Sequence, residues 1–91
     1  MYYVYILKSI KDGNFYTGCS ENLKRRLEEH NKGKVESTKN RRPLQLICYE
    51  AYLDKGTAGK REKFLKTSDG KLDINRRLKK YKKITERCLS G

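Results

Sequence analysis

The fold of this chain is decided by residues 2–19, which read YYVYILKSIKDGNFYTGC. The aromatic, aliphatic and β-branched run over residues 2–7 predicts a strand. Side chains alternate along a strand, and both faces of this run are apolar, so we expect it to be covered on both sides. Asp12-Gly13 is a hairpin signal, because glycine adopts positive φ without penalty. Residues 15–19 are therefore the returning strand, which closes at Gly18, where a side chain would obstruct a neighbouring group.

A helix is expected after this hairpin, over about residues 21–32. Ser20 is the expected N-cap, and Gly33 supplies the C-terminal stop. The polar, basic loop over residues 34–43 ends at Pro43.

The second half of the chain predicts one more strand and two helices. Residues 44–52 are expected to pair with the free edge of the first strand. A short helix covers about residues 58–66 with Thr57 as its N-cap, and residues 68–70 break the chain. A long last helix follows, in which apolar residues recur at spacings of three and four as far as Cys88. The order β-β-α-β-α-α predicts an α+β fold, a small three-stranded, mainly antiparallel sheet flanked by helices.

Length and charge indicate one basic domain over residues 1–91. The net charge is +12, from 23 Lys and Arg against 11 Asp and Glu. Such a field attracts polyanions, so DNA is the expected partner. The alternative is a solvated surface that keeps the protein soluble. A membrane surface is disfavoured, because no helix pairs a basic face with a broad aromatic and leucine face.

The cysteines and the N-terminal residues indicate the cellular compartment of the protein. The three cysteines are an odd number and form no CxxC pair, which disfavours a disulfide framework and a structural zinc site. The apolar run over residues 2–7 is too short for the core of a signal peptide or for a membrane span. We therefore expect a cytoplasmic protein.

Several residues match the needs of phosphodiester hydrolysis, which are deprotonation of a water, neutralisation of phosphate charge and stabilisation of the leaving oxygen. Tyr5 and Tyr16 lie on paired strands, so their hydroxyls could converge; the alternative is a pair of ordinary sheet residues. Arg26 and His30 are four residues apart and share one helix face. The arginine could clamp a phosphate. The alternatives are a snorkelling arginine and a histidine that only satisfies internal hydrogen bonds.

An acidic residue interrupts the basic run between residues 60 and 71. Glu62 lies at the edge of the apolar arc of its helix, where one carboxylate can hold Mg²⁺ with waters completing the shell. The alternative is an ion pair with Lys66, four residues later.

Together these residues resemble the GIY-YIG endonuclease family, in particular its small stand-alone bacterial members, and are similar to the nuclease domain of the excinuclease incision subunit. Tyr3-Val4-Tyr5 stands where the family has Gly-Ile-Tyr, and Tyr16-Thr17-Gly18 stands where it has Tyr-Ile-Gly. Residues 22–31 are similar to the family's arginine-bearing helix, residues 41–44 precede the third strand as in many members, and residues 60–66 look like its glutamate-bearing helix. The resemblance covers about residues 1–80, with a helical extension to residue 89.

The resemblance implies a role for each matched position. Tyr5 and Tyr16 would orient and deprotonate the attacking water, with assistance from His30. Arg26 would stabilise the charged phosphate, and Glu62 would be the sole protein ligand of one Mg²⁺ or Mn²⁺ ion.

Contacts to DNA are expected from a second set of residues. The resemblance implies that Gly18 lets the backbone approach the substrate, and the loop residues Lys39, Arg41 and Arg42 would hold the phosphate backbone. Cys19 stands where some members have lysine, and Asn75 is near the place of a later family asparagine.

The combined expectation is a metal-dependent DNA endonuclease of low sequence specificity, in repair or recombination. A protein partner or a homodimer would supply targeting. The alternative is a non-catalytic nucleic-acid-binding module with a decayed site.

Overall fold

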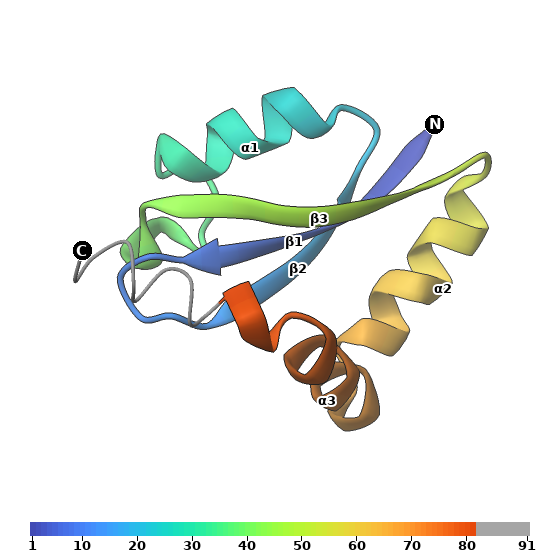
Figure 1. The fold of residues 1–91 in the computed structure, drawn as a ribbon. Helices are drawn as coiled ribbons and strands as arrows, with labels where there is room; N and C mark the ends of the chain where they lie inside the picture. Colours follow the sequence, from blue (N-terminus) through green and yellow to red (C-terminus); the bar gives the residue numbers. More distant parts are fainter. Residues whose placement is uncertain (82–91) are drawn as a thin grey trace.

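A computed structural model of the chain describes residues 1–81 as a sheet with helices on both faces (Figure 1). The elements in chain order are β1 (Tyr2–Ser9), β2 (Phe15–Ser20), α1 (Leu23–Asn31), the 3₁₀ helix η1 (Lys39–Arg41), β3 (Leu44–Tyr52), α2 (Lys55–Leu65) and α3 (Ser68–Arg77). This order confirms the predicted α+β class.

The sheet has three strands in the order β2-β1-β3, and both pairings are antiparallel. The prediction that the third strand joins the free edge of the first is confirmed. Tyr5 in the central strand lies opposite Gly18 of β2 and Tyr49 of β3, and a register shift follows between Ile6 and Leu7. This arrangement places residues from both neighbouring strands beside Tyr5.

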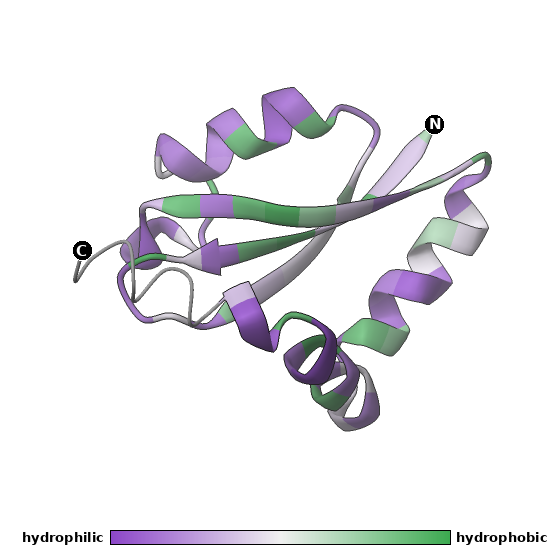
Figure 2. Cartoon of the chain, viewed as in Figure 1, coloured by the Kyte–Doolittle hydropathy of each residue, from purple (hydrophilic) through white to green (hydrophobic). Residues whose placement is uncertain are grey.

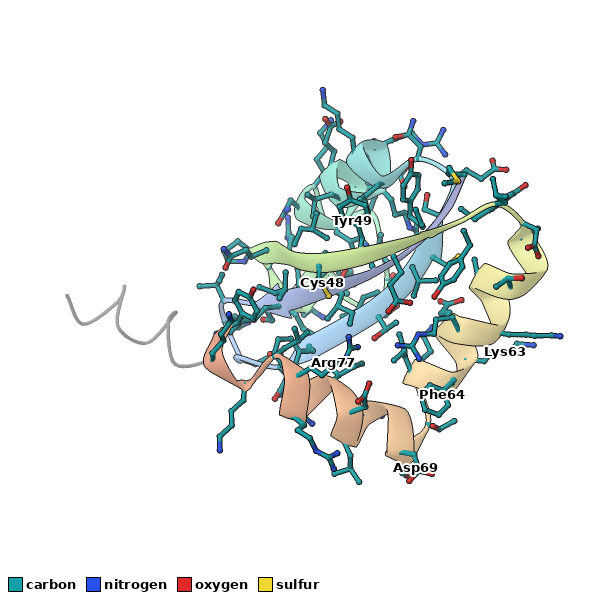
Figure 3. All side chains as sticks on the ribbon, turned by 45° about the vertical axis from the view of Figure 1, so that its right-hand side comes forward. Cys48, Tyr49, Lys63, Phe64, Asp69 and Arg77 are labelled. Atoms are coloured by element: carbon teal, nitrogen blue, oxygen red, sulfur yellow. The ribbon has the colours of Figure 1, made fainter. Side chains whose placement is uncertain are left out.

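The central strand is covered on both faces, as predicted. Val4 and Ile6 belong to a core cluster with residues of α2 and α3, whereas Tyr5 and Leu7 belong to a cluster with residues of β3 and α1. Figure 2 shows the apolar residues along β1 and β3, with hydrophilic residues on the outer turns of the helices. The alternation continues in β3, where Tyr49 lies on the α1 side (Figure 3). The sheet therefore separates two layers of packing.

The N-cap of α1 is Asn22, and the prediction of Ser20 was wrong. The Asn22 side chain accepts a hydrogen bond from the Arg25 backbone N–H at 3.0 Å. The Ser20 hydroxyl instead accepts from the Asn22 backbone N–H at 3.1 Å, so it holds the turn that leads into the helix. Both residues have N-cap chemistry, and position along the turn decides between them.

The start of α2 also differs from the prediction, because Asp54 and not Thr57 is the N-cap. Asp54 Oδ2 accepts from the Thr57 backbone N–H at 2.8 Å, and the Thr57 hydroxyl donates to Asp54 Oδ1 at 2.8 Å. The carboxylate captures the free N–H groups of the first turn, so the helix begins at Lys55, three residues earlier than expected.

The predicted break at residues 68–70 is the first turn of α3, with Thr67 as its N-cap. A Cβ on Gly70 would overlap the backbone of Phe64 and Leu65, so this glycine permits a close crossing of α2 and α3. The helix ends at Arg77, so the predicted single long helix is wrong over the part described; its predicted residues beyond 81, including the extension to 89, lie outside the described residues. No helix within residues 1–81 has the length and apolarity needed to cross a membrane.

Candidate active site

The five residues predicted to carry chemistry come from four elements that meet around β2. Tyr5 lies in β1, Tyr16 in β2, Arg26 and His30 in α1, and Glu62 in α2. The His30 ring lies edge-on to both tyrosines, with ring centroids 5.6 Å from Tyr5 and 5.3 Å from Tyr16. Four of the five side chains therefore share the α1 side of the sheet, while Glu62 reaches the strand edge from the other layer.

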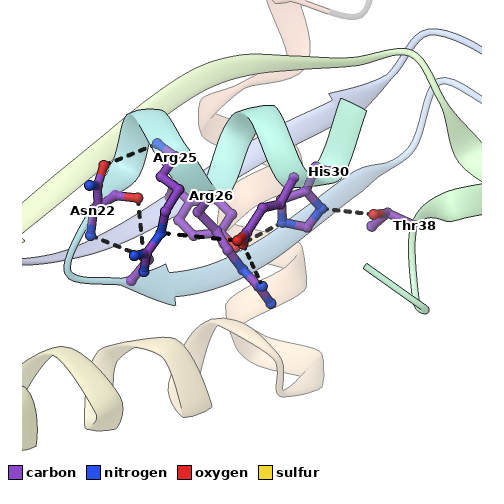
Figure 4. Close-up of polar contacts among 8 residues, drawn as sticks. Asn22, Arg25, Arg26, His30 and Thr38 are labelled. Carbon is purple, nitrogen blue, oxygen red and sulfur yellow. Dashed lines mark hydrogen bonds and ion pairs between the residues drawn. The ribbon is translucent and has the colours of Figure 1, made fainter. Parts of the chain in front are cut away.

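A buried chain of hydrogen bonds runs inward from Tyr5 through His30 to Thr38. The Tyr5 hydroxyl lies 2.9 Å from His30 Nε2, and His30 Nδ1 lies 2.7 Å from Thr38 Oγ1 (Figure 4 shows His30 and Thr38). Exposure is 1% for Tyr5 and 0% for both His30 and Thr38. His30 is therefore a buried residue whose ring nitrogens are hydrogen-bonded to Tyr5 and Thr38.

The electrostatics of this chain follow from its burial. Burial, and next the positive charge of Arg26, lower the pKa of His30 from its ordinary 6.5 to about 4, so the ring is neutral at neutral pH. Burial raises the pKa of Tyr5, and the hydrogen bond and charge of Arg26 act in the opposite direction. The carboxylate of Glu62 contributes a further rise, which places it within electrostatic reach of Tyr5.

Arg26 is held at the surface end of this arrangement. Its Nη1 donates to Glu29 Oε1 at 3.1 Å, and its side chain remains 38% exposed (Figure 4). The neighbouring Arg25 is 67% exposed and lies 4.0 Å from the same carboxylate group. Arg26 thus combines an anchored guanidinium with access to solvent, as a phosphate contact requires.

Glu62 is partly enclosed and paired. Its Oε2 lies 3.0 Å from Lys66 Nζ, so the ion pair considered from the sequence is present, and its side chain is 24% exposed. Lys66 Nζ also lies 6.0 Å from the ring centroid of Tyr16, which links the end of α2 to β2. Among residues 1–81, no three His, Cys, Asp or Glu side chains gather as a metal cluster. A single accessible carboxylate fits a hard cation that keeps most of its waters.

Gly18 makes room for Tyr5. The two residues are cross-strand partners, and a Cβ on Gly18 would overlap the phenol ring and hydroxyl of Tyr5. The neighbouring group that a side chain at position 18 would obstruct is therefore the phenol of Tyr5, which lies inside the protein. Its predicted backbone contact with substrate stays a prediction.

The three basic loop residues each have a partner within the chain. Arg41 Nε lies 2.8 Å from Asp12 Oδ2, which ties η1 to the β1–β2 turn. Arg42 Nε donates to the Lys39 carbonyl at 2.8 Å, and Lys39 Nζ lies 3.1 Å from Glu36 Oε1. These contacts give the loop a structural role, and their use for DNA stays a prediction.

A groove of about 500 Å³ lies beside Tyr16. Arg41 lines it together with Lys66, Lys71 and Asn75 from the α2–α3 region. The sequence interpretation assigned Arg41 to a DNA contact and placed Asn75 near a family position, but it did not join these residues and Lys66 into one groove, because it placed a break where α3 begins.

Comparisons with known proteins show the family to which the chain belongs. A UPF0213 protein from Staphylococcus saprophyticus is 41% identical over 86 residues, which cover 93% of this chain and 95% of that protein. A UPF0213 protein from Staphylococcus aureus is 43% identical over 67 residues, covering 72% of this chain and 80% of that protein. The solution NMR structure of a Bacillus halodurans UPF0213 protein is 35% identical, with a TM-score of 0.51 and coverage of 81% of this chain and 82% of that one. Residues 1–76 match the GIY-YIG catalytic domain, and the chain belongs to that family.

Proposed function

We propose that this domain is a divalent-metal-dependent endonuclease that hydrolyses DNA phosphodiester bonds with low sequence specificity. Membership of the GIY-YIG family suggests a nuclease, and this family typically uses a divalent metal. The observation that carries the proposal is the convergence of Tyr5, Tyr16, Arg26 and His30 beside a groove lined by cations.

The two tyrosines would act at different depths. Tyr16 lines the groove and is half-buried, so we assign to it the contact with the water molecule that attacks a bound phosphate. Tyr5 is 1% exposed and lies behind it, between His30 and Arg26. In this scheme Tyr16 orients and deprotonates the water that attacks phosphorus. Tyr5 assists through its electrostatic interaction with Tyr16.

Arg26 would stabilise the negative charge that builds on the phosphate. Glu29 holds one side of the guanidinium, and the exposed side remains available for a charge-assisted hydrogen bond. Because the group is already anchored, little side-chain freedom is lost when a phosphate binds.

Glu62 would hold the cation. Its ion pair with Lys66 is partly exposed, and such pairs contribute about 0–1 kcal/mol, so a divalent ion can replace the lysine. When bound there, Mg²⁺ or Mn²⁺ would neutralise charge on the phosphate and on the leaving oxygen. The displaced Lys66 would remain beside the DNA strand, since it also lines the groove.

The groove gives the DNA backbone a path past Tyr16. Arg41, Lys66 and Lys71 supply positive charge along it, within a chain of net charge +12. Backbone contacts of this kind are not sequence-specific, so targeting to repair or recombination substrates would come from a protein partner or a second copy.

The test is cleavage of labelled linear, nicked and branched DNA with Mg²⁺, Mn²⁺ or EDTA. Arg26→Ala and Glu62→Gln should each reduce metal-dependent cleavage by about 10³-fold or more, the range for a residue that stabilises transferring phosphate charge. Arg25→Ala and Glu36→Gln are matched controls, because they make the same charge changes on side chains that are 67% and 88% exposed.

Two results would overturn these assignments. Full activity in both Arg26→Ala and Glu62→Gln would refute the assignment of these residues to the active site. Salt-sensitive DNA binding without cleavage of any substrate would instead favour the non-catalytic binding module.

A further inference from the structure

A second groove lies between α1 and β3, and it has no role in the proposed function. Its volume is about 500 Å³. Its apolar lining consists of Leu23 and Leu27 from α1, Leu46 and Tyr49 from β3, and Tyr3 from β1. We call it the Tyr49 groove. A pocket of this size and composition is large enough for a planar ligand such as a nucleobase.

The aromatic side of the Tyr49 groove is open to solvent. The Tyr49 side chain is 55% exposed, and it lies on the α1 side of the sheet (Figure 3). Its ring stands edge-on to the ring of Tyr3, with centroids 5.8 Å apart and an angle of 70° between the planes. An exposed ring held by a second ring is a preformed surface on which another flat ring can stack.

Cations flank the first turn of α1 on both sides. Lys24 is exposed and lines the Tyr49 groove, whereas Arg26 belongs to the candidate active site. The two residues are separated by about 200° around the helix, so they lie on opposite flanks of one turn. The first turn of α1 carries no acidic residue. A DNA strand with one phosphate at Arg26 can therefore continue past the start of α1 to Lys24.

The charge within the Tyr49 groove favours a base over a phosphate as its occupant. Besides Lys24, one acidic side chain lines the groove, that of Glu21. A hydrogen bond with Glu21 raises the pKa of the Tyr2 hydroxyl, so the carboxylate lies at the border of the groove beside β1. One acidic and one basic side chain leave the lining without net charge, which suits the neutral base of a nucleotide whose phosphate lies at Lys24.

We propose that the Tyr49 groove binds one unpaired base of a DNA strand, stacked on Tyr49, with the neighbouring phosphate at Lys24. The bases of an intact duplex are stacked inside the helix, so only an unpaired base can reach such a groove. The proposal rests on the proposed function and names its substrate class, which is DNA with unpaired nucleotides. A second copy of this chain is the competing occupant, and the equal charge of +12 on both copies opposes that contact.

Binding measured in EDTA tests the groove without any need for cleavage. The probes are a labelled oligothymidylate, a strand of the same length made of abasic nucleotides, and a duplex of that length. The first two carry the same phosphates and differ in their bases. The native protein should bind the oligothymidylate more tightly than the abasic strand by about 5–150-fold, the range for one base–aromatic stack. Equal affinity for these two strands, or tighter binding of the duplex, would overturn the proposal.

Substitutions of Tyr49 then locate the base. Because its side chain is largely exposed, Tyr49→Ala should fold, with an unchanged Tm, and should lose the preference for oligothymidylate while its affinity for the abasic strand stays the same. Tyr49→Phe keeps the ring and should retain the preference. Phe64→Ala is the matched control, since this ring is 44% exposed on α2, outside the groove. A preference that survives in Tyr49→Ala would contradict the assignment, as would a native dimer that Tyr49→Ala dissociates without any change in DNA binding.

Cleavage kinetics separate this proposal from the proposed function. A base held away from the reacting phosphate contributes to binding, so Tyr49→Ala should raise KM for single-stranded or flapped DNA and leave kcat unchanged. An unchanged KM on these substrates would remove the groove from substrate recognition. Failure of the native protein to cut any DNA would refute the proposed function and would leave base-dependent binding in the Tyr49 groove standing.

Discussion

Acidification should destabilise this domain through one group, the buried imidazole of His30. The side chain is 0% exposed and its pKa is lowered to about 4, whereas an unfolded chain leaves it at the ordinary 6.5. Between these values the unfolded state binds more protons than the folded state, so the free energy of unfolding falls as the pH falls. The contribution is fully present above about pH 6.5 and is lost by about pH 4.

The size of the effect follows from the same two pKa values. The gap between 6.5 and about 4, at 1.36 kcal/mol per pKa unit, amounts to about 3 kcal/mol in total. About 2 kcal/mol of this falls between pH 7 and pH 5. For a domain of this size such a loss lowers Tm by roughly 8–16 °C.

Denaturant unfolding between pH 7 and pH 5 measures this contribution cleanly. The chain has one histidine, and the carboxyl groups with lowered pKa, such as Asp12 and Glu50, remain ionised over this range. His30→Gln is the matched variant, since its amide keeps hydrogen-bonding groups but does not titrate. The native protein should lose about 2 kcal/mol over this range and His30→Gln much less. Equal losses in the two proteins would refute the assigned burial of the ring.

The remaining predictions concern the close contact under Tyr5 and the groove. Gly18→Ala should destabilise the domain by about 1–3 kcal/mol in thermal unfolding, because its Cβ would overlap the Tyr5 phenol. Gly59→Ala, with nothing within 4 Å of its Cβ, should stabilise it by about 0.5–1 kcal/mol, and equal effects of the two substitutions would contradict the packing. Lys71→Ala should reduce the slope of log affinity against log salt for duplex DNA by about 1, as one phosphate contact is lost. Lys63→Ala, on the outer side of α2 (Figure 3), is the control and should leave that slope unchanged.

The sheet was predictable because its signals are local. Alternation along residues 2–7 and the turn at Asp12-Gly13 define the first hairpin, and the structure confirms both the pairing and the cover on two faces. The helix starts were less predictable, since Ser20 and Asn22 have the same capping chemistry and only the backbone path chooses between them. The apparent break at Gly70 is a close crossing of two helices, and such a crossing is not visible in a sequence.

The residues of the candidate site could be predicted from the sequence, but the burial of their side chains could not. The resemblance placed Tyr5, Tyr16 and His30 at matched positions, and the structure brings their rings together. That His30 is completely buried, and that it is paired with Thr38, depends on the path of the polar loop over residues 34–43. No periodicity marks Thr38 in that loop, so long-range packing alone identifies it.

Residues of the proposed site also form the packing layer beneath α1, and this overlap affects how activity data must be interpreted. Tyr5 belongs to a core cluster with Leu7 and Leu44, and Tyr16 packs against it. Removing the Tyr5 side chain would therefore create a cavity and abolish its hydrogen bond together, so a loss of cleavage would not distinguish unfolding from chemistry. Arg26 lies outside that cluster and is 38% exposed, so its truncation changes charge with little change in packing. A large loss of cleavage at Arg26 with unchanged Tm would therefore weigh more for catalysis than the same loss at either tyrosine.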